Sequence, residues 1–83
     1  MADPRDVEGT KICRKEFIKH RVDVSRCDIR CSHGVVYIRG LIQPEKGAAY
    51  ESVEEETLRI ARLLRQRPMV RDVVVDARYL GGL

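Results

Sequence analysis

The chain has 83 residues, which is enough for one hydrophobic core and too few for two ordinary domains. With 43% hydrophobic and 35% charged residues and no Trp, its composition is that of a globular protein and excludes a disordered or fibrous chain. The net charge of +3 faintly favours anionic partners but falls well short of a nucleic-acid signature.

Two features bear on location. The three Cys cannot all pair within the chain, and their spacing is not that of a disulfide scaffold, so we expect a reducing compartment. No apolar run approaches the roughly 20 residues that span a bilayer, and residues 1–10 hold no signal-peptide core. Taken as complete, the chain is expected to be cytoplasmic; taken as a fragment, it leaves an exported parent protein open.

The ends of the chain are expected to be loose. Residues 1–9 carry Pro4, Gly9 and mixed charges without a period, which predicts a flexible leader. We expect one domain over residues 10–80 and a flexible tail over residues 81–83.

A short amphipathic helix is predicted first. Helix-forming residues fill positions 11–21, and Cys13 and Phe17 stand four apart on one face. Thr10 is placed to cap the first turn of this helix.

A β-hairpin follows the helix. On both sides of a turn at residues 32–34, every second residue is predicted to face the core. These residues are Cys27, Ile29 and Cys31 before the turn and Val36, Ile38, Gly40 and Ile42 after it. His33 is expected to be an exposed residue of this turn.

A second helix and a third strand complete the chain. After a turn at residues 44–47, three- and four-residue spacing predicts a helix as far as Arg67, with an apolar stripe of Ala49, Val53, Thr57, Ile60, Ala61 and Leu64. Pro68 ends this helix, and the β-branched run at residues 70–79 predicts a strand.

The order helix, strand, strand, helix, strand predicts an α+β fold. We expect a small two-layer sandwich in which two helices cover one face of a three-stranded mixed sheet. A right-handed crossover lets the third strand pair in parallel with a hairpin strand, and the sequence leaves open which strand is central. An exposed strand edge favours self-association, so a homodimer also stays open.

Residues 34–42 resemble the G-x-V-x-L-x-G-x-V strand of BON domains. A downstream segment resembles the one that closes the sheet in that family, at Met69, Val70, Val73, Val75, Ala77 and Tyr79. The chain departs from the family pattern at Met69 and Val75, where the family has Gly and Asn. The resemblance covers about residues 10–80.

The resemblance implies a binding module. BON-like domains are associated with binding phospholipid or other ligands and with accessory roles, and the family has no catalytic residue set. In the hairpin, Gly34 is expected to supply a turn conformation, Val36 and Ile38 to fill the core, and Gly40 to permit close backbone approach or a bend. These roles are structural, so no cofactor is expected.

The Cys and His residues allow two chemical readings. Cys13, Cys27, Cys31 and His33 invite a zinc site, but Cys27 and Cys31 stand roughly 13 Å apart along an extended strand. A nucleophilic Cys would need His20 or His33 beside it, and no sequence feature brings them together. Small buried apolar side chains are the favoured role for the three Cys.

The charges of the second helix favour a structural role. Glu51, Glu54, Glu55 and Glu56 open it, and Arg59, Arg62, Arg65 and Arg67 close it. This polarity complements the helix dipole, and Glu55 and Arg59 are predicted to form an i,i+4 pair.

The first helix carries the best candidate for an anion-facing or lipid-facing surface. Its basic residues, with Ile18 among them, are Lys11, Arg14, Lys15 and Lys19. We therefore expect a non-catalytic module that contacts phospholipid, a small ligand or a protein partner. The alternative is a small nucleic-acid-binding domain, against which the few aromatic residues argue. No catalytic motif is present, so no enzyme is expected.

Overall fold

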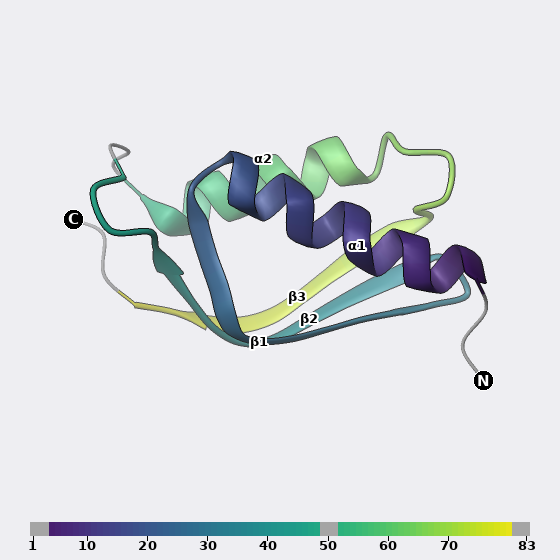
Figure 1. Ribbon diagram of the computed structural model, residues 1–83, viewed down its shortest axis with the longest axis horizontal. Helices are drawn as coiled ribbons and strands as arrows, with labels where there is room; N and C mark the ends of the chain where they lie inside the picture. Colours follow the sequence, from purple (N-terminus) through teal and green to yellow (C-terminus); the bar gives the residue numbers. More distant parts are fainter. Residues whose placement is uncertain (1–3, 49–51, 81–83) are drawn as a thin grey trace.

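The structure is a computed structural model that describes residues 4–48 and 52–80 (Figure 1). Its helices are α1 (Pro4–Lys19) and α2 (Val53–Leu64), and its strands are β1 (Val22–Ser32), β2 (Val35–Pro44) and β3 (Asp72–Tyr79). The strands form one sheet, and both helices pack on the same face of it. The predicted α+β sandwich of order α-β-β-α-β is confirmed.

The sheet has β2 at its centre. The strand order is β1-β2-β3, with β1 antiparallel and β3 parallel to β2. Ile38 of β2 lies opposite Ile29 of β1 and Val75 of β3. A parallel pair needs a long crossover, and α2 supplies it. The structure thus settles the central strand, which the sequence left open.

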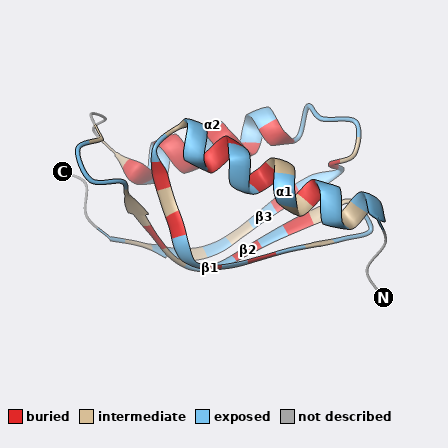
Figure 2. Cartoon of the chain, viewed as in Figure 1, coloured by how far each residue is buried: buried red, intermediate tan, exposed pale blue. Residues whose placement is uncertain are grey.

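The core lies between the sheet and the two helices. Phe17 of α1, Ile38 of β2 and Ile60 and Leu64 of α2 are fully buried. Figure 2 shows buried residues recurring along both helices and alternating along the strands. Each large apolar side chain buried in this way stabilises the fold by about 1.5–3 kcal/mol. The alternating apolar residues of the strands and the apolar stripes of the helices therefore pack into one core.

The first helix begins at Pro4, inside the predicted leader. Proline suits the first helical position because its missing N–H would have no partner there. The predicted cap is wrong, since Thr10 lies inside α1 and its hydroxyl donates to the Asp6 carbonyl oxygen at 3.1 Å. Residues 1–3 of the predicted leader and the predicted tail at 81–83 lie outside the described residues.

Gly9 explains why the sequence did not predict this early start. A glycine destabilises a helix by roughly 1 kcal/mol relative to alanine. Gly9 therefore favours the prediction that residues 1–9 are irregular. In the structure Gly9 is buried, and a Cβ there would lie 2.9 Å from the Cys31 sulfur. The glycine therefore lets α1 approach β1 closely, a tertiary reason that local propensity does not contain.

The second helix is shorter at its carboxyl end than predicted. It ends at Leu64 rather than Arg67, and β3 begins at Asp72 rather than at residue 70. A proline disfavours the helical conformation of the residue before it, so Pro68 disfavours a helical Arg67 and the helix stops short of that position. At the other end the Ser52 side chain caps the helix by accepting the Glu55 N–H, and residue 49 of the predicted stripe lies outside the described residues.

Candidate functional site

The four hairpin residues have the structural roles that the sequence predicts. Gly34 has a φ of 81° in the turn between β1 and β2, and Val36 and Ile38 are fully buried. Gly40 has a φ of 122°, and a Cβ there would lie 2.5 Å from the Arg26 carbonyl oxygen. This motif therefore builds the sheet and offers no chemical group to a ligand.

The hairpin turn is tied to the first helix by Asp6. Its carboxylate accepts the backbone N–H groups of His33 and Gly34, each at 3.3 Å, and lies 3.6 Å from the Cys31 sulfur. His33 is exposed in this turn, as predicted. No pattern in the sequence predicts the Asp6 contact, because the two segments lie far apart along the chain.

Burial raises the pKa of all three thiols. Cys13 is fully buried and its pKa is about 12. Burial also raises the pKa of Cys27 and of Cys31, and the nearby Asp6 carboxylate adds to the rise at Cys31. A nucleophilic cysteine needs the opposite shift. The thiols lie where small apolar side chains would, and residues 4–48 and 52–80 hold no cluster of three potential metal ligands.

A histidine bridges two carboxylates between the helices. His20 follows the last residue of α1, and its Nε2 lies 3.3 Å from Glu16 of α1. Its Nδ1 lies 2.9 Å from Glu56 of α2, and both glutamates are mostly buried. The imidazole therefore links the two helices through both of its ring nitrogens.

Two arginines complete this cluster. Arg59 pairs with Glu56 at 3.0 Å, so the predicted pair of Arg59 with Glu55 is wrong. Arg67 lies 3.7 Å from Glu16. Each buried carboxylate thus has an arginine partner besides His20, so positive side chains balance the two negative charges between the helices. The sequence missed it because the spacing of Glu56 predicted only local pairs.

The four basic residues predicted to face an anion all lie on the solvent side of α1. Lys11, Arg14, Lys15 and Lys19 are exposed, and we call them the basic face. At 3.6 residues per turn they lie opposite the buried side of the helix that holds Cys13 and Phe17. In the described part of the chain no hydrogen bond or ion pair occupies them.

Two apolar side chains are exposed on the same side of α1. Ile18 is 66% exposed and Val7 is 42% exposed. By helical spacing Ile18 lies one turn from Arg14 and Lys15 and beside Lys19. Such mixed basic and apolar side chains are typical of helices that lie on anionic membrane surfaces.

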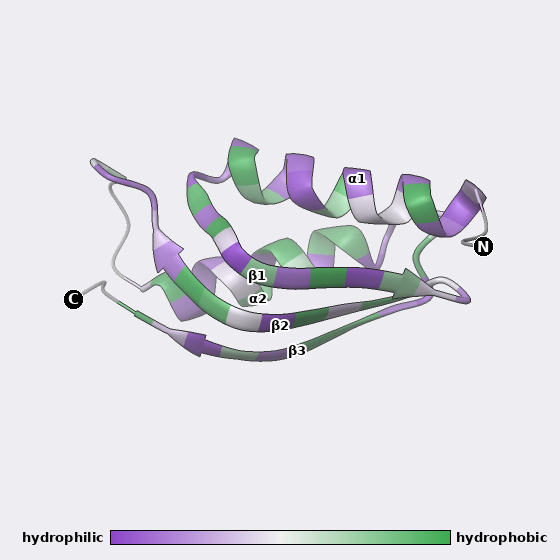
Figure 3. Ribbon diagram, turned by 60° about the horizontal axis from the view of Figure 1, so that its bottom comes forward, coloured by the Kyte–Doolittle hydropathy of each residue, from purple (hydrophilic) through white to green (hydrophobic). Residues whose placement is uncertain are grey.

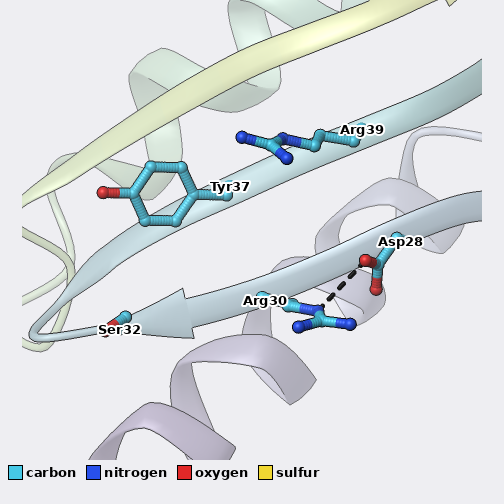
Figure 4. A pocket seen from close by; sticks show the side chains of 5 residues that line it. All are labelled: Asp28, Arg30, Ser32, Tyr37 and Arg39. Carbon is cyan, nitrogen blue, oxygen red and sulfur yellow. Dashed lines mark hydrogen bonds and ion pairs between the residues drawn. The ribbon is translucent and has the colours of Figure 1, made fainter.

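The uncovered face of the sheet is the other candidate. It holds a shallow hollow of about 380 Å³, lined by Asp28, Arg30 and Ser32 of β1 and by Tyr37 and Arg39 of β2 (Figure 4). Arg30 is paired with Asp28 at 3.0 Å. The strand register places Arg39 between Asp28 and Asp76. Acidic groups therefore offset the arginines of this hollow.

The aromatic residues limit a nucleic-acid reading of that face. Tyr37 is 38% exposed, whereas Phe17 is buried in the core and Tyr79 is half-buried. Tyr50 lies outside the described residues. Single-stranded nucleic acids are usually held by several stacked bases, and one exposed ring provides one stacking position. The basic face of α1 is thus the stronger candidate for an anionic partner.

Neither helix of the described chain combines the length and the apolar content of a membrane-spanning helix. Comparisons of the chain with protein-family models, curated proteins and solved structures find no match. The likeness to BON domains stays a prediction that rests on the hairpin at residues 34–42 and the segment after the second helix.

Proposed function

We propose that the protein is a non-catalytic binding module that docks on an anionic phospholipid surface through the outer side of α1. The observation that carries this proposal is Ile18, an aliphatic side chain two-thirds exposed among the four residues of the basic face. On a membrane surface, basic side chains contact the lipid headgroups and an apolar side chain between them enters the acyl-chain region.

The energies favour reversible binding. Each Lys or Arg near an anionic membrane contributes about 1 kcal/mol, and salt screens the attraction beyond a Debye length of about 8 Å. The basic face, Lys11, Arg14, Lys15 and Lys19, can therefore supply about 4 kcal/mol at moderate salt. Insertion of Ile18 and Val7 adds to this. Phe17 anchors the opposite side of α1 in the core, so the helix is formed before it meets the membrane.

The cysteines support a cytoplasmic setting for this proposal. Cys13, Cys27 and Cys31 are all free thiols, and free thiols persist in reducing compartments. The cytoplasmic leaflet is also the one that carries anionic lipid. A cytoplasmic module with a basic face therefore has its partner surface in the same compartment.

The test is co-sedimentation with vesicles of phosphatidylcholine alone and of phosphatidylcholine with phosphatidylserine, at low and moderate salt. We expect binding to the anionic vesicles, weakened by salt. The combined variant Lys11→Ala, Lys15→Ala, Lys19→Ala should bind about 100-fold more weakly, from about 1 kcal/mol for each charge.

The matched control removes three basic residues elsewhere, in the combined variant Arg26→Ala, Lys46→Ala, Arg62→Ala. These side chains are exposed and lie outside α1, so the net charge falls equally while the basic face stays intact. Ile18→Ser should weaken binding with no change of charge. Equal losses in the two charge variants, or no binding of the wild-type chain to anionic vesicles at low salt, would overturn the proposal.

A further inference from the structure

A shallow hollow lies between α1 and the first part of β1. Its volume is about 430 Å³, and it is lined by Arg14 and Ile18 of α1, by residues 22–25 of β1 and by Glu45. Two views of the ribbon show this part of β1 turning toward the end of α1 (Figure 1 and Figure 3). β1 is an edge strand, so among the described residues no further strand covers the outer side of the hollow.

The strand wall of the hollow is irregular. The pairing of β1 with β2 shifts between Asp23 and Arg26, so in the described sheet Val24 and Ser25 have no partner on β2. Val24 is buried, whereas Ser25 is exposed. Bulges of this kind re-aim side chains and are frequent next to active sites. The irregular segment brings Asp23 and Ser25 into the wall of one hollow.

Two charges of opposite sign line this hollow without an ion-pair partner. Among the described residues no acidic side chain pairs with Arg14, and no basic side chain pairs with Asp23. The Asp23 carboxylate accepts from two neutral donors, the Ser25 N–H at 2.9 Å and the Gln43 amide at 2.8 Å. These bonds, first of all the one from the Ser25 N–H, lower the pKa of Asp23, so the carboxylate is ionised at neutral pH. An ionised carboxylate accepts about four hydrogen bonds, so Asp23 can also accept from a ligand.

The two charges lie near each other. Both act on the thiol of Cys27, whose pKa is raised mainly by burial, lowered by Arg14 and raised by Asp23. The second carboxylate of the hollow already has a basic partner, since Glu45 lies 3.9 Å from Arg21. Arg14 and Asp23 are therefore the two charges that a single small ligand could contact together.

We propose that this hollow binds the headgroup of phosphatidylserine, with Arg14 on the phosphate and Asp23 on the ammonium group. The inference rests on the proposed lipid contact of α1 and names the lipid that it selects. A purely anionic group would be repelled by Asp23, and a purely cationic group by Arg14, so charge complementarity calls for a ligand with both signs. A water molecule occupies about 30 Å³, so the hollow has room for a headgroup of about a dozen non-hydrogen atoms.

The charges of the common phospholipids favour the serine headgroup. Phosphatidylglycerol is anionic but has no ammonium group. Phosphatidylcholine and phosphatidylethanolamine have no net charge, and choline has no N–H to donate. Phosphatidylserine combines an ammonium donor with the negative charge that attracts the basic face. Because Arg14 belongs to the basic face and Ile18 also lines the hollow, a headgroup held here leaves its acyl chains beside Ile18.

The test compares phosphatidylcholine vesicles that contain an equal fraction of phosphatidylserine or of phosphatidylglycerol, which have the same net charge. We expect the wild-type chain to bind the phosphatidylserine vesicles roughly fivefold more tightly, as one exposed charge pair allows. Asp23→Asn keeps the size of the side chain and removes its charge, so the two affinities should become equal. The matched control Asp28→Asn removes an exposed carboxylate of β1 outside the hollow and should keep the preference. Circular dichroism should show that both variants are folded.

A second measurement needs no membrane. Glycerophosphoserine at millimolar concentration should shift the backbone amide NMR signals of residues 23–25, and glycerophosphoglycerol should not. Equal wild-type affinity for the two anionic vesicles, a preference that Asp23→Asn retains, or one that Asp28→Asn loses would each overturn the serine site and leave the lipid contact of α1 in place. A chain that binds neither vesicle contradicts the proposed function instead. In that case the soluble headgroup decides the site, and the absence of shifts with glycerophosphoserine would overturn it.

Discussion

At the scale of single residues, Gly40 shows how one backbone position shapes the central strand. Its φ of 122° is a conformation that side chains rarely adopt, and a Cβ would lie 2.5 Å from the Arg26 carbonyl oxygen and 3.0 Å from the Cys27 Cα. The register shift of β1 lies directly beside this approach. Because both contacts are with backbone, no side-chain movement can relieve them.

We therefore expect Gly40→Ala to lower the free energy of unfolding by about 3 kcal/mol, from strain in the backbone and displacement of β1. The control is Gly47→Ala. Gly47 has a φ of 83°, but among the described residues a Cβ there would meet only the end of the Arg21 side chain, at 3.7 Å. This variant should lose about 1 kcal/mol. Urea unfolding measures both, and equal losses would contradict the role of the close approach.

At the scale of elements, the two helices are joined by a charged contact rather than by apolar packing alone. His20 bridges Glu16 of α1 and Glu56 of α2 at the end of α1. Both carboxylates are about nine-tenths buried, where a charge without a partner is costly. The contact fixes how the helices lie side by side on the sheet.

His20→Ala should lower the free energy of unfolding by about 1–3 kcal/mol, because it removes the imidazole that contacts two buried carboxylates. In a double-mutant cycle with Glu56→Gln, we expect a coupling energy of about 1 kcal/mol. Arg62→Ala, an exposed change on the same helix, should alter stability by less than about 0.5 kcal/mol. A His20→Ala variant as stable as the wild-type chain would show that the arginines suffice.

For the whole molecule, the burial of each cysteine determines how much of the fold must open before a reagent reaches its thiol. Cys13 lies at the interface of α1 and the sheet with no exposed surface, and burial raises its pKa to about 12. Cys31 is half-buried near the hairpin turn, at the end of β1. The first thiol needs the helix layer to leave the sheet, whereas the second needs only a local opening.

Timed alkylation at pH 8, read by peptide mass spectrometry, should modify Cys31 first and Cys13 last. Alkylation of Cys13 should be slower than in the unfolded chain by roughly 5000-fold or more, since a domain of this kind is stable by about 5 kcal/mol or more. Its rate should also rise with urea as the global unfolding equilibrium does. Labelling of Cys13 as fast as of Cys31 would mean that α1 detaches independently.

Much of the architecture follows from patterns near each residue. The alternation around Ile29 and Ile38 and the helical spacing of Ile60 and Leu64 predict the hairpin and the second helix, because burial on one face imposes those periods. The boundaries were less accurate. Gly9 marked a loose leader but is packed against β1, and Pro68 ends α2 some residues before itself. The predicted basic face is exposed as expected, because helical spacing alone puts it opposite Cys13 and Phe17.

The element order, the fold class and the buried side of each element can be predicted from the amino-acid pattern, since they depend on local periodicity and on one chain burying one core. The packed fold, by contrast, decided that β2 is central, that Asp6 holds the hairpin turn and that His20 joins Glu16 to Glu56. It also decided that Arg65, at the C-cap of α2, contacts Asp72 and the Val73 carbonyl oxygen of β3. These are contacts between segments distant along the chain, and the energy of such a contact depends on three-dimensional proximity that no local pattern encodes.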